Sequence, residues 1–563
     1  MQETRGGQGQ GYVLIGLFSV FLVITGFSIA QTSITPAEKL LIYDLNIFSL
    51  VYYVPLTFWV GLLGILFLFL YVFIANHRIV SSKFTDIFLF VLMITILLVV
   101  FGLPYIVEPN PRFVDSWVHG GTAKNIIETG RLNPQEFPYQ NYPLSFVLLS
   151  MLSIVSGLEL TVVLRFLPSI LIFLFFTSLT VFFNKIVKNS RLAMVSVLVF
   201  ALSTFYLPFH FSPEAFGWIF FFLLFALLVK DVAERKSQKS VSKSDTVVLM
   251  LLIVAIAITH PVTQFMTVLI MLTLAIAGAW IWKVKFVTKN IVFYALMVFS
   301  AWAIFFGYQY FEVIIKSFEI AILNNLGDFS SSILLRNLQE SSPLEVANLL
   351  LFRRALYLLV PITAIYGVFH FFRKNKAILV FFVTWLSVAF ISLPLTVFGL
   401  MPLERPIKIA FIPLALFSAC LVVQKKKLGS LLLIFLLVTI PINFASFYWN
   451  EASTMTHNWE LASAEFIGGN FNGTILGEFK ETSIMRFYGN YSKVFNDYSA
   501  YGIRPDIFNM TFIRDMRIEL VYITQLTIFR ASLIGINVDA AEFINDTGFN
   551  CIYSNGYSSA FLR

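Results

Sequence analysis

A polar segment, Glu108 to Gly121, interrupts a strongly apolar chain and carries residue types that could do chemistry. Asp115 and His119 are four residues apart, so a helix running from about Ser116 to Thr129 would place them on one face of its first turn. A carboxylate beside an imidazole could carry a proton or contribute to a metal site. Asp115 could instead only cap the helix, because aspartate is a preferred N-cap residue.

The other ionisable side chains of the apolar runs lie towards run ends that we expect to face outside. Ion-coupled transporters usually need such groups near the middle of the membrane. The pattern therefore favours a polar rim at one membrane face. A simple preference of charged side chains for the membrane interface explains the position of most of these residues equally well. The rim candidates are Asp115, His119, Arg165, His210, Glu214, His260, Arg353, Arg354, Glu404 and Arg405.

Two predicted outside loops carry groups that suit an anion. A guanidinium such as that of Arg405 can bind a phosphate through two hydrogen bonds, and Lys408 would add a point charge. His260 lies in a tight turn, where it could bind phosphate, donate to a sugar or cap a helix. Glu214 follows Pro213, and a carboxylate in a first helical turn is also favoured by the helix dipole.

The composition defines a polytopic membrane protein, because 58% of the residues are hydrophobic and only 12% are charged. The two cysteines, Cys420 and Cys551, fall in regions that we expect in different environments, which excludes a disulfide framework. The net charge of +8 comes from basic residues in short loops. That distribution indicates membrane topology and gives no reason to expect nucleic-acid binding.

Apolar runs of spanning length predict about thirteen transmembrane helices. The short run Pro143–Gly157 is better explained as an interfacial or re-entrant helix, because only then do all the basic loops face the cytoplasm. The N-terminus is then cytoplasmic and the C-terminus extracytoplasmic. The predicted spans are Gly11–Ala30, Leu50–Ala75, Asp86–Val107, Leu160–Phe183, Leu192–Leu207, Ala215–Val229, Thr246–Thr259, Val262–Ile281, Ile291–Tyr310, Ala355–Phe369, Ala377–Phe398, Ile407–Val423 and Leu428–Phe447.

The chain divides into three parts. Residues 1–85 carry extra transmembrane helices, residues 86–447 form a transmembrane core with external loops, and residues 448–563 are polar enough for a soluble extracytoplasmic domain. The last part mixes a possible helix, Ala452–Ile467, with short strand-like runs, Thr474–Leu476, Leu520–Phe529 and Cys551–Tyr553. We therefore expect a small α/β domain there.

The layout resembles the GT-C superfamily of integral-membrane glycosyltransferases, which includes oligosaccharyltransferases, protein O-mannosyltransferases and lipid A aminoarabinose transferases. The segment Asp115-Ser-Trp-Val-His119 is similar to the first outside loop of that superfamily, where an essential acid lies. The stretches Asn141–Leu144 and Gly157–Ser169 resemble its juxtamembrane segment and next span. Ser212–Gly217 resembles its second acidic loop, and Glu404–Pro406 resembles its lipid-phosphate-binding arginine segment.

This resemblance implies a GT-C-like fold and transfer of a sugar from a polyprenyl-phosphate or pyrophosphate lipid to an acceptor, with inversion at the anomeric carbon. Asp115 would act on the acceptor nucleophile, and Arg405, with Lys408 or Arg165, would neutralise the departing phosphate. His260 and Trp117 are further substrate-binding candidates. If Mg²⁺ or Mn²⁺ takes part, Asp115, His119 and Glu214 would be its ligands, and a metal-independent mechanism is equally permitted.

Two other classes of function stay open. One is a transporter or flippase of a lipid-linked solute, and the other is a membrane scaffold with a sugar-binding ectodomain. A transporter predicts charged or broken helices at mid-depth, where the sequence shows mainly prolines such as Pro168 and Pro361. The identity of the acceptor, whether protein, lipid or glycan, does not follow from the residues.

Overall fold

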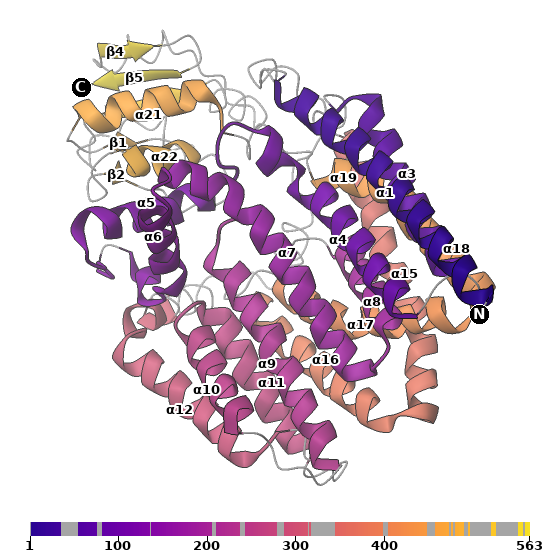
Figure 1. Cartoon of the computed structure of the whole chain (residues 1–563). Coiled ribbons are helices and arrows are strands. Elements are labelled where there is room, and N and C mark those ends of the chain that lie inside the picture. Colours follow the sequence, from indigo (N-terminus) through magenta and orange to yellow (C-terminus); the bar gives the residue numbers. More distant parts are fainter. Residues whose placement is uncertain are drawn as a thin grey trace.

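The protein is described from a computed structural model, in which most of the chain forms α-helices (Figure 1). The structure describes residues 2–34, 54–75, 82–135, 137–204, 210–236, 243–278, 287–312, 315–316, 344–397, 404–447, 456–471, 475–476, 479–488, 494–495, 520–524, 550–554 and 558–562. The side chains of Arg353, Arg354 and Glu404, three of the rim candidates, lie outside that description.

The chain is a helical membrane protein. Six helices within the described ranges are long and apolar enough to cross a bilayer. They are α1 (Gln2–Ile34), α3 (Leu56–Ala75), α4 (Ser82–Val107), α7 (Leu160–Val187), α16 (Lys376–Val397) and α17 (Glu404–Gln424). The other helices of the bundle are α8 (Ser190–Ser203), α9 (Pro213–Lys236), α10 (Lys243–Ala257), α11 (Pro261–Ala277), α12 (Lys289–Phe305), α15 (Leu344–Lys374), α18 (Lys426–Val438) and α19 (Ile440–Phe447).

Every predicted span contains a helix, while the number of thirteen crossings stays a prediction. The last predicted span differs most, because it is divided at Thr439 into α18 and α19. Pro441, the second residue of α19, has no N–H to continue the hydrogen-bond ladder, and the Thr439 hydroxyl donates to the carbonyl of Leu436 at 2.7 Å. A proline and a hydroxyl that bonds the backbone are sufficient to end one helix and begin the next.

Helix α8 is the centre of the bundle. It packs against α4, α7, α15 and α17, and all its side chains from Leu192 to Ser203 are buried. A helix that is apolar on nearly all sides can lie inside a bundle or face lipid, and here neighbouring helices surround it. By contrast, α1 packs on α3 and α4 and leaves much of its surface exposed, along one side of the molecule (Figure 1).

The two ends of the bundle carry different groups. Arg191 and Asp86 form an ion pair of 3.5 Å that joins the start of α8 to the start of α4. The basic turns Lys185–Arg191, Arg373–Lys376 and Lys425–Lys427 follow the ends of α7, α15 and α17. The starts of α9, α11 and α17 meet at the opposite end of the bundle, where the segment after α4 also lies.

That opposite end is covered by two short helices. Helix α5 (Val114–Thr129) begins two residues before the predicted start and ends at Gly130, which adopts a left-handed conformation with φ of 68°. A 3-10 turn, η2 (Pro138–Asn141), leads to α6 (Leu144–Ser156). With 13 residues, α6 is too short to cross a bilayer, and its predicted interfacial position remains a prediction.

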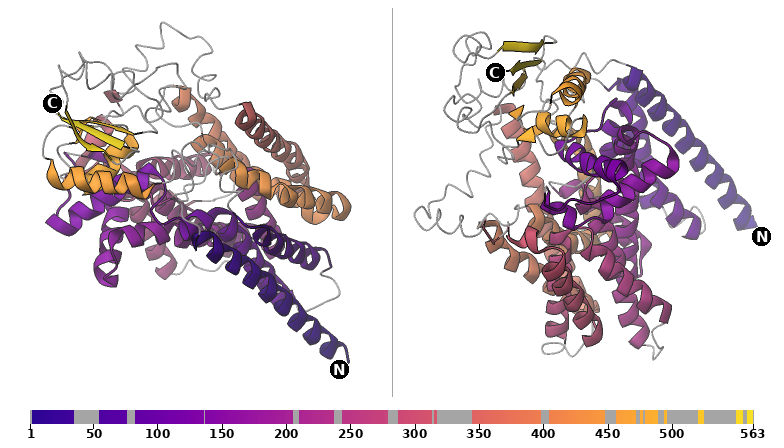
Figure 2. Two further views of the ribbon diagram at one scale, coloured as in Figure 1. Left: turned by 90° about the horizontal axis from the view of Figure 1, so that it is seen from above. Right: turned by 90° about the vertical axis from the view of Figure 1, so that its left-hand side faces the viewer.

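The C-terminal residues form a small mixed sheet with two helices, which lie at the α5 end of the bundle (Figure 2). Strand order is β2-β1-β3-β5-β4, with β1 parallel to β2 and β3, and β5 antiparallel to β3 and β4. The elements are α21 (Asn458–Asn470), β1 (Ile475–Leu476), α22 (Phe479–Tyr488), β2 (Val494–Phe495), β3 (Leu520–Thr524), β4 (Asn550–Ser554) and β5 (Ser558–Leu562). The three predicted strand runs overlap β1, β3 and β4, while α22, β2 and β5 were not predicted.

Candidate active site

Asp115 lies in the first turn of α5 with its side chain 52% exposed, in contact with a buried histidine. The Nε2 atom of His210, whose side chain is 5% exposed, lies 3.3 Å from Oδ2 of Asp115. Phe113 precedes the helix with φ of 69° and ψ of 138° and packs its ring 5.2 Å from the His210 ring. A non-glycine residue in such a conformation costs on the order of 1–3 kcal/mol, and residues of this kind cluster at functional sites.

The pKa of the Asp115 carboxyl lies below its ordinary value. Burial acts to raise the pKa, but the contact with His210 and the charge of that histidine, with a smaller effect of His119, outweigh burial and the charge of Glu214. Asp115 is therefore a carboxylate at neutral pH. An ionised, half-exposed carboxylate is able to accept a hydrogen bond from an incoming hydroxyl.

His119 lies beside Asp115 in an aromatic surrounding. Its ring stacks on Tyr139 at 5.8 Å between centroids and contacts Phe146 and Phe211. Burial lowers the pKa of His119 to about 4, with the charge of Asp115 acting in the opposite direction, so the imidazole is neutral at pH 7. Its Nδ1 atom is buried without a hydrogen-bond partner among the residues that the structure describes.

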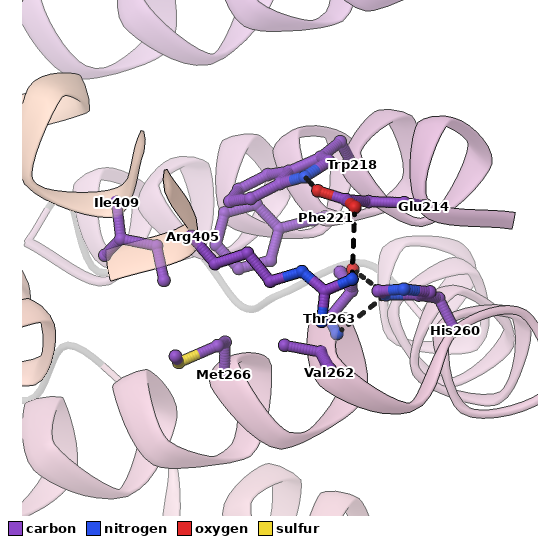
Figure 3. Close-up of a pocket in the computed structure, with 9 residues that line it drawn as sticks. All are labelled: Glu214, Trp218, Phe221, His260, Val262, Thr263, Met266, Arg405 and Ile409. Carbon is purple, nitrogen blue, oxygen red and sulfur yellow. Dashed lines mark hydrogen bonds and ion pairs between the residues drawn. The ribbon is translucent and has the colours of Figure 1, made fainter. Parts of the chain in front are cut away.

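A second group of charges meets at the starts of α9 and α17 (Figure 3). Glu214 accepts from Lys408 Nζ at 2.7 Å and from Trp218 Nε1 at 3.1 Å, and the Arg405 guanidinium lies 3.5 Å from its other oxygen. Lys408 is 2% exposed, whereas Arg405 is 23% exposed. The carboxylate thus fixes two cations that are 191 and 194 residues away in the sequence.

His260 caps the N-terminus of α11. Its Nδ1 accepts the backbone N–H of Thr263 at 3.1 Å and lies 2.8 Å from the Thr263 hydroxyl. Burial lowers the pKa of His260 to about 3, and the charge of Arg405 adds to that effect, so this imidazole is also neutral. Of the three roles that the sequence left open for His260, the structure shows the cap.

The second group surrounds a small pocket between α9, α11 and α17, with room for about one water molecule (Figure 3). Glu214, His260 and Arg405 form its polar part. Its other walls are Trp218, Phe221, Val262, Thr263, Met266 and Ile409. The pocket therefore combines a charged end with a largely apolar wall.

Tyr139 connects the two groups. Tyr139 lies in η2. The centroid of its ring is 6.2 Å from that of His260 and 5.7 Å from that of Tyr310. Burial raises the pKa of Tyr139 well above its ordinary value. The charges of Tyr310, Glu214 and Asp115 act in the same direction, and the charge of Arg405 opposes them. Because the Tyr139 ring contacts both His119, which lies beside Asp115, and His260, which lines one pocket with Arg405, the two groups form one continuous site.

Two of the predicted substrate-binding residues are placed elsewhere. Arg165 donates to the carbonyl of Ile106 at 2.9 Å, at the end of α4. Trp117 is fully buried, and its indole donates to Thr456 Oγ1 at 3.0 Å, on the side of α5 that faces the C-terminal domain. The structure brings the other predicted residues, Asp115, His119, Glu214, His260, Arg405 and Lys408, to one end of the bundle.

The predicted metal ligands Asp115, His119 and Glu214 do not form a ligand set in this arrangement. Across the described ranges, no three His, Cys, Asp or Glu side chains converge as a metal site requires. Glu214 is held by two cations, whose charges would oppose a divalent ion beside it. Since these residues do not fit a metal, we derive no step from one.

Several residues of the site were not among the predicted catalytic or binding residues. His210 was named only for the polar rim, and Tyr139 and Trp218 were not singled out. The only sequence signal for His210 is its position four residues before Glu214 in one short loop. Comparison of the chain with protein-family models and with curated proteins shows no match, so the function has to be argued from the residues and their geometry.

Proposed function

We propose that the protein is a membrane glycosyltransferase that moves a sugar from a polyprenyl-phosphate or pyrophosphate lipid to an acceptor. The observation that supports this proposal most is one site, at one end of a bundle of apolar helices, with a half-exposed carboxylate and two cations. The charges lie at the end of the bundle, where a lipid headgroup would reach them.

In the proposed reaction, the donor phosphate lies at the more exposed cation, Arg405, with Lys408 held behind by Glu214. The acceptor oxygen attacks the anomeric carbon from the side of Asp115, and the bond between that carbon and the phosphate oxygen breaks, so the configuration is inverted. The negative charge of the leaving phosphate is stabilised by the guanidinium. Asp115 orients the acceptor hydroxyl and receives its proton, which can pass to solvent from the exposed carboxylate.

The orientation of the site follows from the basic turns. They lie at the end of the bundle away from Asp115, and basic residues in short loops face the cytoplasm. The proposal therefore includes a cytoplasmic N-terminus and an extracytoplasmic site in the cell membrane. The described ionisable groups of the site lie at helix starts, which favours an enzyme at the membrane face over a transporter with groups at mid-depth.

The proposal is tested with the full-length protein in lipid vesicles, supplied with radiolabelled polyprenyl-phosphate sugars and a membrane acceptor fraction. Asp115→Asn should lower kcat by at least about 10²-fold while the protein stays folded, because the amide cannot take the proton. Glu159→Gln, the same kind of change at an exposed position just before α7, should leave transfer unchanged. Full transfer by Asp115→Asn would remove the catalytic assignment.

Arg405→Ala should raise KM for the donor and lower kcat, with little effect on KM for the acceptor, because the guanidinium is proposed to contact only the phosphate. The same vesicles and labelled donors provide the measurement. An equal loss of donor and acceptor binding would show that Arg405 supports the structure and not the donor.

A further inference from the structure

Helix α5 has two functional faces. Successive residues of an α-helix are turned by about 100°, so Asp115 and His119 point to one side, while Trp117 and Lys124 point roughly 160–180° away from Asp115. The first side meets His210 and Tyr139. The second side meets the C-terminal domain, whose helix α22 packs along α5.

Three hydrogen-bonded anchors join α5 and the preceding segment to that domain. The Asn110 amide donates to the carbonyl of Thr456 at 3.0 Å and to Oδ1 of Asn458 at 2.9 Å. The Trp117 indole donates to Thr456 Oγ1 at 3.0 Å. Lys124 Nζ donates to the carbonyl of Phe487 at 2.7 Å.

The anchors lie on both sides of Asp115 in the sequence and are supported by close packing. The Trp117 ring meets that of Phe487 edge-on at 5.1 Å. At Gly120, one turn further, a Cβ atom would come within 2.5 Å of Leu164 on α7 and 3.4 Å of Phe487 on α22. Helix α5 is thus fitted between the membrane bundle and the C-terminal domain, with little freedom to shift.

We propose that the C-terminal domain positions the carboxylate of Asp115, through the contacts of Thr456, Asn458 and Phe487 with the rear face of α5. This inference rests on the proposed function for its effect on transfer, and it gives the domain a role in the reaction without any contact with the substrate. A displacement of about 1 Å in a reacting group can lower a rate by ~10²-fold. Loss of even one of these contacts should therefore lower the rate of transfer.

The deciding variant is Thr456→Val, which keeps the shape of a fully buried side chain and removes the acceptor of the Trp117 N–H. Thr456→Ser keeps the hydroxyl and serves as the conservative variant. Thr129→Val is the matched control, because within the described part of the chain the exposed Thr129 hydroxyl bonds only to the carbonyls of Asn125 and Arg131 and to the N–H of Arg131. Each full-length protein is assayed in vesicles for kcat and KM, and for hydrogen exchange of the α5 amides.

We expect Thr456→Val to lower kcat about tenfold with KM for the donor nearly unchanged, and to speed exchange in α5. Thr456→Ser and Thr129→Val should behave as wild type. Unchanged exchange in α5, or faster exchange with an unchanged kcat, would overturn the proposal. If the wild-type protein transfers no sugar from any donor, the proposed function fails, and the exchange of α5 alone still decides whether the domain holds that helix.

Discussion

At the scale of single residues, the contact between Asp115 and His210 determines how the site should respond to pH. Only the Asp115 side chain is substantially exposed, while His210 is buried behind it. The substrate would therefore meet the carboxylate, and His210 acts as a positioning residue. The neutral His119 beside them, with a pKa of about 4, does not change its charge between pH 5.5 and 8.

Replacing His210 should move the acidic limb of the pH profile. Because the pKa of Asp115 is lowered, its carboxylate persists as pH falls below the usual range of an aspartic acid, and activity is lost only as pH falls through the lowered pKa. In His210→Phe, the largest effect that opposes burial and the charge of Glu214 is removed, so the pKa of Asp115 rises. We expect loss of activity at higher pH, measured as kcat/KM from about pH 3 to 8.

His370→Phe gives the matched control, because His370 lies near the end of α15 beside Lys374, away from the site. Its pH profile should follow that of wild type. An unchanged acidic limb in His210→Phe would show that the contact with Asp115 has no influence on the carboxylate.

At the scale of helices, α17 carries both cations of the site and is fixed by its contact with α15. A Cβ atom at Gly367 would lie 2.1 Å from the carbonyl oxygen of Phe417. The two backbones are therefore in the close contact that small residues allow between membrane helices. The hydroxyl of Thr363, one turn before Gly367, lies 2.5 Å from the hydroxyl of Ser418, which follows Phe417. The packing of α17, the helix that carries Arg405, thus depends in part on a glycine in another helix.

Gly367→Ala should destabilise the protein by about 1–3 kcal/mol, because the added methyl group forces α15 away from α17. Thermal unfolding in detergent should show the loss as a lower Tm. Gly26→Ala in α1 is the control, since nothing lies within 4 Å of its added Cβ atom. Equal Tm values for the two variants would contradict the close approach of α15 and α17.

The helices could be predicted from the sequence because each corresponds to its own apolar run. Such a run forms a helix whether its side chains face lipid or a neighbouring helix, so the prediction did not require the packing. The partners of charged residues could not be predicted in that way. Glu214 and Lys408 are 194 residues apart, and only packing brings them together. Trp117 was expected at the substrate, but the docked C-terminal domain takes its indole N–H.

The backbone at Phe113 could not be predicted either. A positive φ is expected at glycine, and phenylalanine adopts it only when the surroundings enforce it. Here the surroundings include the buried ion pair of Glu108 and Arg112 immediately before it. Local sequence preference therefore located α5, while tertiary contacts determined how Asp115 enters the site.

At the scale of the whole molecule, the separation of basic turns from the site predicts which residues face outwards. After replacement of Cys551 and Cys420 by serine, Gln135→Cys, at an exposed position between α5 and η2, should react with a membrane-impermeant maleimide applied to intact cells. Lys376→Cys, exposed at the start of α16, should react only after the membrane is opened. The reverse labelling would invert the proposed topology.

The hydrogen bond between Trp117 and Thr456 spans 339 positions of the chain. During biosynthesis, the ribosome makes the helix that carries Asp115 early and the residues that hold it last. On the proposed function, a nascent chain already inserted into the bilayer would lack these contacts until Thr456, Asn458 and Phe487 have been translated. A chain that terminates before Thr456 should therefore insert and show little transfer, in contrast to the full-length protein.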